Sequence, residues 1–221
     1  MFGKLITTLT TTALFMCAST GLSGLAFADD SVANVARGEQ LFELCSQCHG
    51  ANGEGKIDNL APAIAAMPPW YIEMQLKNFK SGVRGLHPDD RGGLRMYPMS
   101  LWLRTEADQK DVAAYISSLP PTVTERELEE LGDAAKGQGY FAVCSACHGA
   151  DGSGNPQMGA PPLVGLSDWY LYSSIQKYKS GIRGSGAGDV YGPAMIGMVA
   201  TLPDDDAVRD VIAHIQALEK K

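Results

Sequence analysis

The 221-residue chain carries 18 Lys and Arg against 25 Asp and Glu, which gives a formal net charge of -7 at pH 7 with histidine counted as neutral. This acidity argues against a nucleic-acid-binding protein, because binding to phosphates requires a basic surface. It favours partners with basic surfaces, or simple solubility. The hydrophobic fraction of 45% is that of a globular protein.

The amino terminus has the pattern of a secretory signal peptide. Lys4 precedes an apolar stretch through Leu14–Met16, and the small-residue site Ala26-Phe27-Ala28 follows. The stretch is short and interrupted by glycines, so it does not have the length of a membrane anchor. We predict cleavage after Ala28. About 193 residues then remain, with a net charge near -8 and four cysteines.

Two pentapeptides carry the chemistry of the chain. Cys45-Ser46-Gln47-Cys48-His49 returns 99 residues later as Cys144-Ser145-Ala146-Cys147-His148, and C-x-x-C-H is the attachment signature of a c-type haem. Two thiols three positions apart can bond to the two vinyl groups of one porphyrin, and the histidine that follows can ligate the iron. The sequence therefore predicts two covalently bound haem c groups. The predicted attachment and proximal residues are Cys45, Cys48, His49, Cys144, Cys147 and His148.

Other uses of a C-x-x-C pair fit less well. A structural zinc site needs four protein ligands, and each copy supplies at most three with no second cysteine pair nearby. A thioredoxin-like motif belongs in an alternating strand and helix pattern, which this sequence lacks. Haem attachment in bacteria takes place outside the inner membrane. Together with the signal peptide, it predicts a periplasmic location.

The haem motifs lie inside a longer internal repeat. Residues 37–119 align with residues 136–218 at a constant offset of 99, without a gap, which indicates a duplicated unit. Pro120-Pro121 ends the first unit, and an acidic stretch leads into the second. We predict a signal peptide over 1–28, a first domain over 29–120, a linker over 121–135 that carries a helical turn, and a second domain over 136–221.

Each repeat is predicted to contain three helices separated by long loops rich in glycine and proline. The first helix ends in the haem motif. The second ends before a glycine that suits a helix C-terminus, and the third has apolar residues at three- and four-residue spacing. In the first repeat, the second and third helices are expected over 70–80 and about 106–118. In the second repeat, they are expected over 169–179 and around the matching residues Val211, His214, Ile215 and Leu218. The predicted fold class is all-α, with each domain wrapped around one haem.

The sixth iron ligand must lie far from the motif, and methionine is the ligand type that raises a haem's potential and suits electron transfer. Each repeat offers two methionines at matching positions, Met96 and Met99 in the first and Met195 and Met198 in the second. Periodicity does not separate the members of a pair. One member of each is expected to be a packing residue, as most methionines are.

At this point the chain resembles the dihaem cytochromes c4, which are built from tandem class I cytochrome c domains. The resemblance rests on the paired haem motifs, on the Tyr71-x-x-x-Gln75-Leu76-x-x-Phe79-x-x-Gly82 stretch, and on Met96 and Met195, each followed seven residues later by a leucine. It implies that Met96 and Met195 are the iron ligands. It also implies that the carbonyls of Pro62 and Pro161 accept a hydrogen bond from the proximal histidines.

Four further features have simpler interpretations. Arg84 and Arg183 are predicted either to bind haem propionates or to lie on the surface. His214 is interpreted as a helix-face residue and His87 as exposed. The acidic run over 204–206 is predicted to cap the last helix.

Function follows from ligation. If histidine and methionine saturate each iron, no position is open for a substrate, and the protein passes single electrons. The resemblance implies a membrane quinol-oxidising complex or a periplasmic dehydrogenase as donor, and a terminal oxidase or reductase as acceptor. It leaves open a peripheral position at the membrane surface. The alternatives are a cytochrome subunit of a dehydrogenase complex, and a dihaem enzyme such as a thiosulfate dehydrogenase.

Overall fold

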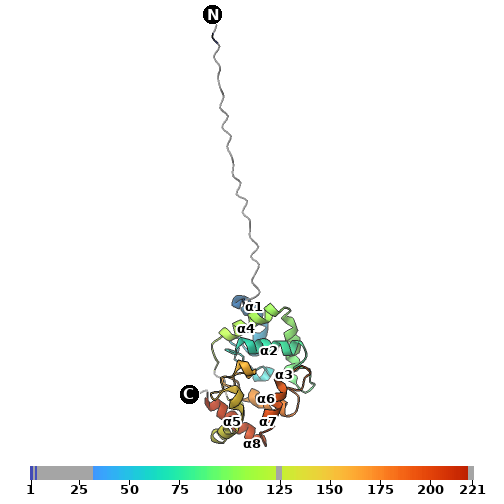
Figure 1. Ribbon diagram of the computed structural model, residues 1–221, viewed down its shortest axis with the longest axis vertical. Helices are drawn as coiled ribbons and strands as arrows, with labels where there is room; N and C mark the ends of the chain where they lie inside the picture. Colours follow the sequence, from blue (N-terminus) through green and yellow to red (C-terminus); the bar gives the residue numbers. More distant parts are fainter. Residues whose placement is uncertain (2, 4–31, 123–125, 219–221) are drawn as a thin grey trace. The chain divides into compact units, whose positions relative to one another are not determined.

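The computed structural model describes residues 1, 3, 32–122 and 126–218, and all regular structure in these ranges is helical (Figure 1). Apart from residues 1 and 3, the predicted signal peptide and its cleavage after Ala28 lie outside the described residues. No helix in the described ranges is long and apolar enough to cross a membrane. The elements are α1 (Val35–His49), η1 (Ile57–Asn59), α2 (Pro69–Lys80), α3 (Arg91–Trp102), α4 (Glu106–Ser118), α5 (Ala134–His148), η2 (Pro156–Met158), α6 (Asp168–Lys179), α7 (Gly192–Val199) and α8 (Asp205–Leu218).

The all-α fold class is confirmed, and the two repeats fold in the same way. In each, the first helix packs against the last, α1 on α4 and α5 on α8. The helices approach so closely that a Cβ added at Gly38 would lie 2.0 Å from the carbonyl oxygen of Asp111. At the equivalent Gly137, the distance to the carbonyl oxygen of Asp210 would be 1.9 Å. A glycine is therefore required at each crossing, because any side chain would force the helices apart.

The three helices expected in each repeat are present, but the structure adds a fourth to each, α3 and α7. Both carry the candidate methionines, in segments that the sequence predicts to be loops. The expectation failed because Gly92, Gly93 and Pro98 suggest irregular chain. Asp90 overrides that signal by accepting a hydrogen bond from the N–H of Gly93 (3.0 Å), which caps the first turn of α3.

The segment between the repeats differs in detail from the expected linker. Helix α5 begins at Ala134, capped by the Asp133 side chain (2.8 Å to the N–H of Ala135), so its first two residues lie inside the predicted 121–135 linker. No helical turn is present in the described residues from 121 to 133. The prediction for the acidic run is confirmed, since the Asp204 carboxylate accepts from the N–H of Ala207 (2.8 Å) at the start of α8.

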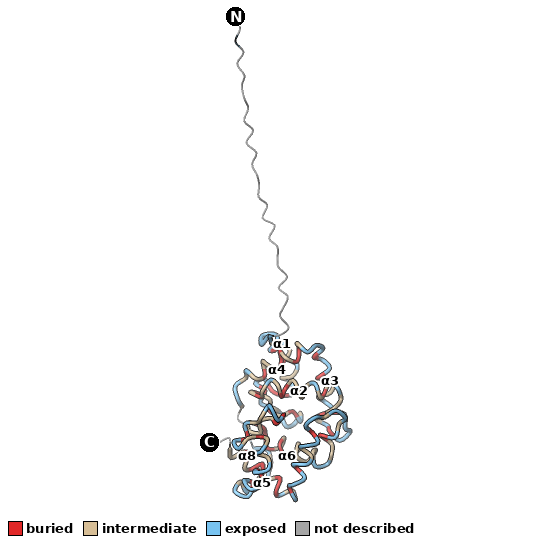
Figure 2. The backbone as a smooth tube through the Cα atoms, in the orientation of Figure 1, coloured by how far each residue is buried: buried red, intermediate tan, exposed pale blue. Residues whose placement is uncertain are grey.

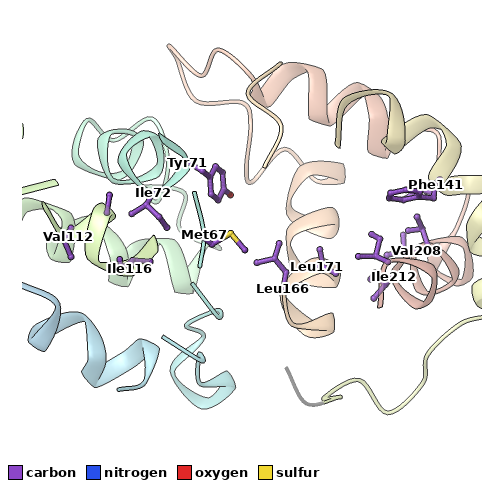
Figure 3. Packing of buried hydrophobic residues seen from close by; sticks show 14 of the residues in the cluster. Met67, Tyr71, Ile72, Val112, Ile116, Phe141, Leu166, Leu171, Val208 and Ile212 are labelled. Atoms are coloured by element: carbon purple, nitrogen blue, oxygen red, sulfur yellow. The ribbon is translucent and has the colours of Figure 1, made fainter. Parts of the chain in front are cut away.

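Apolar residues of both repeats form one continuous cluster. Buried residues lie inside both halves and between them (Figure 2). Met67 and Leu166 occupy equivalent positions in the two repeats, and Figure 3 shows them facing each other between the halves. Both are buried, with 4% and 6% of their surface exposed. The halves are therefore joined through an apolar contact as well as through the linker.

Candidate haem sites

The proximal histidine of the first repeat lies at the end of α1, in a buried and oriented position. His49 is 6% exposed, and its Nδ1 lies 2.8 Å from the carbonyl oxygen of Pro62. Burial lowers the pKa of His49, although the bond to Pro62 opposes that effect. The imidazole is therefore held neutral, with Nδ1 donating and Nε2 free to bind a metal.

The second repeat reproduces this arrangement at the end of α5. His148 is 4% exposed, and its Nδ1 lies 2.7 Å from the carbonyl oxygen of Pro161. Burial again lowers the pKa of the imidazole. Both proline carbonyls thus occupy the positions that the family resemblance implies.

The cysteine pairs lie on the same helices, with one cysteine a turn before the histidine and the other directly before it. They line two cavities together with the histidines and with apolar side chains. Burial raises the pKa of the Cys45 thiol to about 11 and also raises that of Cys144. A dithiol redox site needs a cysteine with a lowered pKa. The raised pKa values of Cys45 and Cys144 therefore give the thioredoxin-like alternative no support.

Both candidate methionines of each repeat line the corresponding cavity. Met96 and Met99 lie on α3 at the first cavity, and Met195 and Met198 lie on α7 at the second. Met99 and Met198 are exposed (41% and 38%), whereas Met96 and Met195 are partly buried. Each cavity therefore holds a histidine from the first helix of its repeat and methionines from the third.

Comparisons with known proteins agree with this geometry. The cytochrome c family profile matches the chain twice, over residues 35–120 and 134–219. The chain belongs to the cytochrome c family. Its two tandem domains and its similarity to cytochromes c4 place it with the dihaem cytochromes c4, which are electron-transfer proteins with two covalently bound haem c groups.

Two relatives and two solved structures illustrate the match. Cytochrome c4 of Azotobacter vinelandii is 28% identical over 90% of this chain and 94% of its own length. The thiosulfate dehydrogenase electron acceptor of Stutzerimonas stutzeri is 29% identical over 80% of both chains. The crystal structure of reduced cytochrome c4 from Pseudomonas stutzeri superposes with a TM-score of 0.66 at 27% identity, covering 84% of this chain and 98% of that one. Thiosulfate dehydrogenase from Marichromatium purpuratum also reaches 0.66, at 30% identity over 82% of this chain but only 39% of that chain.

Between the two haem cavities, this cytochrome has a reciprocal contact that the sequence does not reveal. Arg84 of the first domain donates to the Tyr170 hydroxyl of the second (3.2 Å), and Arg183 of the second donates to the Tyr71 hydroxyl of the first (3.5 Å). The two arginines are equivalent in the repeat, as are the two tyrosines. The domains therefore contact each other through a symmetric pair of crossed hydrogen bonds.

These arginines fit a haem with its propionates. Arg183 is only 8% exposed, which excludes the surface role considered for it. The Nε of Arg84 is buried without a hydrogen-bond partner, and neither guanidinium forms a salt bridge within the described ranges. Burial alone would raise the pKa of the Tyr170 hydroxyl, but the two cations outweigh it and lower that pKa to about 7. Carboxylates are the groups that such a positive site accommodates best.

One ion pair between the domains has no counterpart in the repeat. Lys177 on α6 donates to the Asp90 carboxylate that caps α3 (2.7 Å). Asp90 is 1% exposed. The position equivalent to Lys177 in the first repeat is Asn78. The second domain therefore holds the start of the helix that carries Met96, and the first domain does not return that contact.

Proposed function

We propose that this cytochrome carries single electrons in the periplasm between a membrane or periplasmic donor and a terminal oxidase or reductase. The observation that carries the proposal is the matched set of side chains in each cavity, which a buried, carbonyl-bonded histidine and two methionines line together. A haem supplies a one-electron couple between ferric and ferrous iron, and the protein sets its potential through the axial ligands and their surroundings.

We propose Met96 and Met195 as the sixth ligands. Their partial burial supports this choice, because a thioether bound to iron is enclosed by the protein and the cofactor, whereas Met99 and Met198 are exposed at the cavity mouths. Two saturated irons leave no position for a substrate, which favours a carrier over an enzyme.

The contact between the domains supports electron exchange within the molecule. The crossed Arg–Tyr bonds and the Met67–Leu166 contact hold the cavities against each other, and residues of each domain line the cavity of the other. Tyr170 and Trp169 line the first cavity, and Tyr71 lines the second. An electron that enters at one haem is expected to reach the other without a diffusive step.

The proposed partners follow from the relatives. One relative is named a thiosulfate dehydrogenase electron acceptor, which supports a periplasmic dehydrogenase as donor. A subunit of a cbb3-type oxidase is 36% identical over 59% of this chain, which supports a terminal oxidase as acceptor. The signal peptide expected at residues 1–28 supports the periplasmic location.

The test separates a carrier from a thiosulfate-oxidising enzyme. The purified holoprotein is reduced and then titrated anaerobically with ferricyanide, and separately it is mixed with thiosulfate and excess ferricyanide. A carrier takes up one equivalent of oxidant per haem and shows no continuing ferricyanide reduction by thiosulfate. Sustained turnover that scales with protein concentration would contradict the proposal and favour the enzyme.

A further inference from the structure

The mouth of the first haem cavity differs in charge from that of the second. Helix α3 presents four exposed residues at helical spacing, Arg91, Arg95, Met99 and Trp102, and all four line the first cavity. Residues separated by three or four positions share one face of a helix. These four residues, here called the α3 stripe, therefore form a continuous row along the cavity mouth.

The second repeat lacks this row. Its equivalent residues are Val190, Ala194, Met198 and Thr201, so only the methionine is shared. The exposed residues that line the second cavity are largely apolar, with Val143, Met158 and Tyr191 among them (41%, 48% and 40% exposed). The domains differ in the same direction, since residues 35–120 contain nine Lys and Arg against ten Asp and Glu, and residues 134–219 contain five against eight.

The charges of the α3 stripe are available to a partner. Arg91 and Arg95 form no salt bridge within the described part of the chain, and Arg95 donates instead to the carbonyl oxygen of Asn59 (2.7 Å). That bond joins α3 to η1 across the mouth and limits the movement of the guanidinium. Asp89 lines the same cavity, but it lies beside His87, with 3.8 Å between Oδ2 and Nδ1.

The aromatic and sulfur side chains give the stripe an apolar part. Trp102 is 52% exposed and Met99 is 41% exposed. Tryptophan, methionine and arginine are enriched in the central contacts of protein interfaces. Two exposed arginines, of which Arg95 is held by its hydrogen bond to Asn59, share this face of α3 with an exposed tryptophan. Such a surface attracts an acidic protein and can exclude water on contact.

We propose that the α3 stripe is the docking surface for a redox protein with an acidic face, and that this partner exchanges electrons with the first haem. The proposal rests on the electron-carrier function proposed above. It refines the expectation from composition, because an acidic chain as a whole favours basic partners, whereas two exposed arginines lie at the mouth of the first haem cavity.

The experiment uses an acidic flavodoxin as a defined probe, since its surface charge is strongly negative and its hydroquinone reduces haem proteins. Stopped-flow reduction of the oxidised holoprotein is measured at ionic strengths from about 10 mM to 1 M, over which the screening length falls from about 30 Å to 3 Å. The principal variant is Arg91→Val/Arg95→Ala, which places the second repeat's own residues on α3. Lys136→Gln, an exposed basic residue on α5, is the control.

We expect the double variant to react about tenfold more slowly than the wild type at low ionic strength and within about twofold at 1 M, because steering is lost on screening. The control should stay within about twofold throughout. Calorimetric titration of the oxidised proteins should show a similar loss of affinity in the double variant only. Trp102→Thr should weaken binding at both salt concentrations, because its contribution is apolar.

Three results would overturn the proposal. Equal rates for wild type and double variant at low salt would show that the stripe does not dock the probe. A shifted haem potential without a change in affinity would assign the arginines to the haem propionates. A variant that slows the cationic reductant hexaammineruthenium as strongly as flavodoxin would indicate a general defect. If the wild type accepts electrons from neither reductant, the carrier function itself fails.

Discussion

Replacing the glycine at the crossing of the first and last helices should strongly lower the stability of the domain that contains it. In α5, Gly137 lies against α8, and a Cβ there would meet the Asp210 carbonyl oxygen at 1.9 Å and its carbon at 2.5 Å. Two residues further on, Gly139 is exposed and has no atom within 4 Å of an added Cβ. Gly137→Ala and Gly139→Ala therefore make the same chemical change in one helix, with and without a clash.

The magnitude follows from the geometry. An ordinary carbon–oxygen contact of about 3.4 Å requires α5 and α8 to separate by roughly 1.5 Å at Gly137. The clashing carbon and oxygen of Asp210 both belong to the backbone, so no side-chain rotation can remove the clash. Overpacking of this kind costs about 3 kcal/mol or more, offset by about 1 kcal/mol of helix propensity. We expect Gly137→Ala to lose about 2–3 kcal/mol and Gly139→Ala to gain up to about 1 kcal/mol.

The assay is thermal unfolding of the oxidised holoprotein, followed by calorimetry and circular dichroism. For a domain of this size, 1 kcal/mol corresponds to roughly 4–8 °C. The second domain of Gly137→Ala should therefore melt roughly 10–20 °C lower, while Gly139→Ala melts at or slightly above the wild-type temperature. Equal melting of the two variants would refute the account of the helix crossing.

Two further predictions concern the first haem site. Met96→Ala should remove the absorption band that depends on a methionine bound to ferric iron and should allow the reduced first haem to bind carbon monoxide, whereas Met99→Ala should change neither; the reverse pattern would assign the ligand to Met99. Lys177→Asn should destabilise the protein by about 1–3 kcal/mol at pH 7, because buried Asp90 loses its cation. Burial alone would raise the pKa of Asp90, but the hydrogen bonds from Lys177 and Gly93 lower that pKa. The ion pair therefore stabilises the fold above the unfolded carboxyl pKa of about 4, and this stabilisation is lost as the pH falls from there through the lower pKa of the folded protein. Urea unfolding at pH 7 and at pH 3 should show that variant and wild type differ less in their free energy of unfolding at the lower pH. A difference that does not change with pH would contradict the role of the ion pair.

Local sequence signals predicted most of the haem environment. The C-x-x-C-H motifs place two cysteines and a histidine on one helix end, and this geometry depends only on short spacing. The haem motif, a terminal glycine and apolar periodicity placed the first, second and third helix of each repeat, and each lies within a few residues of its expected position. The partners Pro62 and Pro161 came from the family resemblance and not from periodicity.

The features that sequence reasoning missed depend on contacts over long distances. Helix α3 forms despite Gly92, Gly93 and Pro98 because a buried aspartate caps it and Lys177 of the other domain holds that aspartate. The crossed bonds of Arg84 and Arg183 join residues 86 and 112 positions apart. The sequence does show an arginine and a tyrosine at equivalent positions in both repeats. A single sequence does not show, however, that the arginine of one repeat contacts the tyrosine of the other.

The central claim is that both irons are ligated by histidine and methionine and that the protein is a carrier. An optical redox titration of the purified holoprotein tests it most directly, with carbon monoxide added to the fully reduced form. We expect two low-spin haems with positive potentials, methionine-dependent absorption from both in the ferric state, and no carbon monoxide adduct. A high-spin component, or one haem that binds carbon monoxide readily, would show an open iron and contradict the claim.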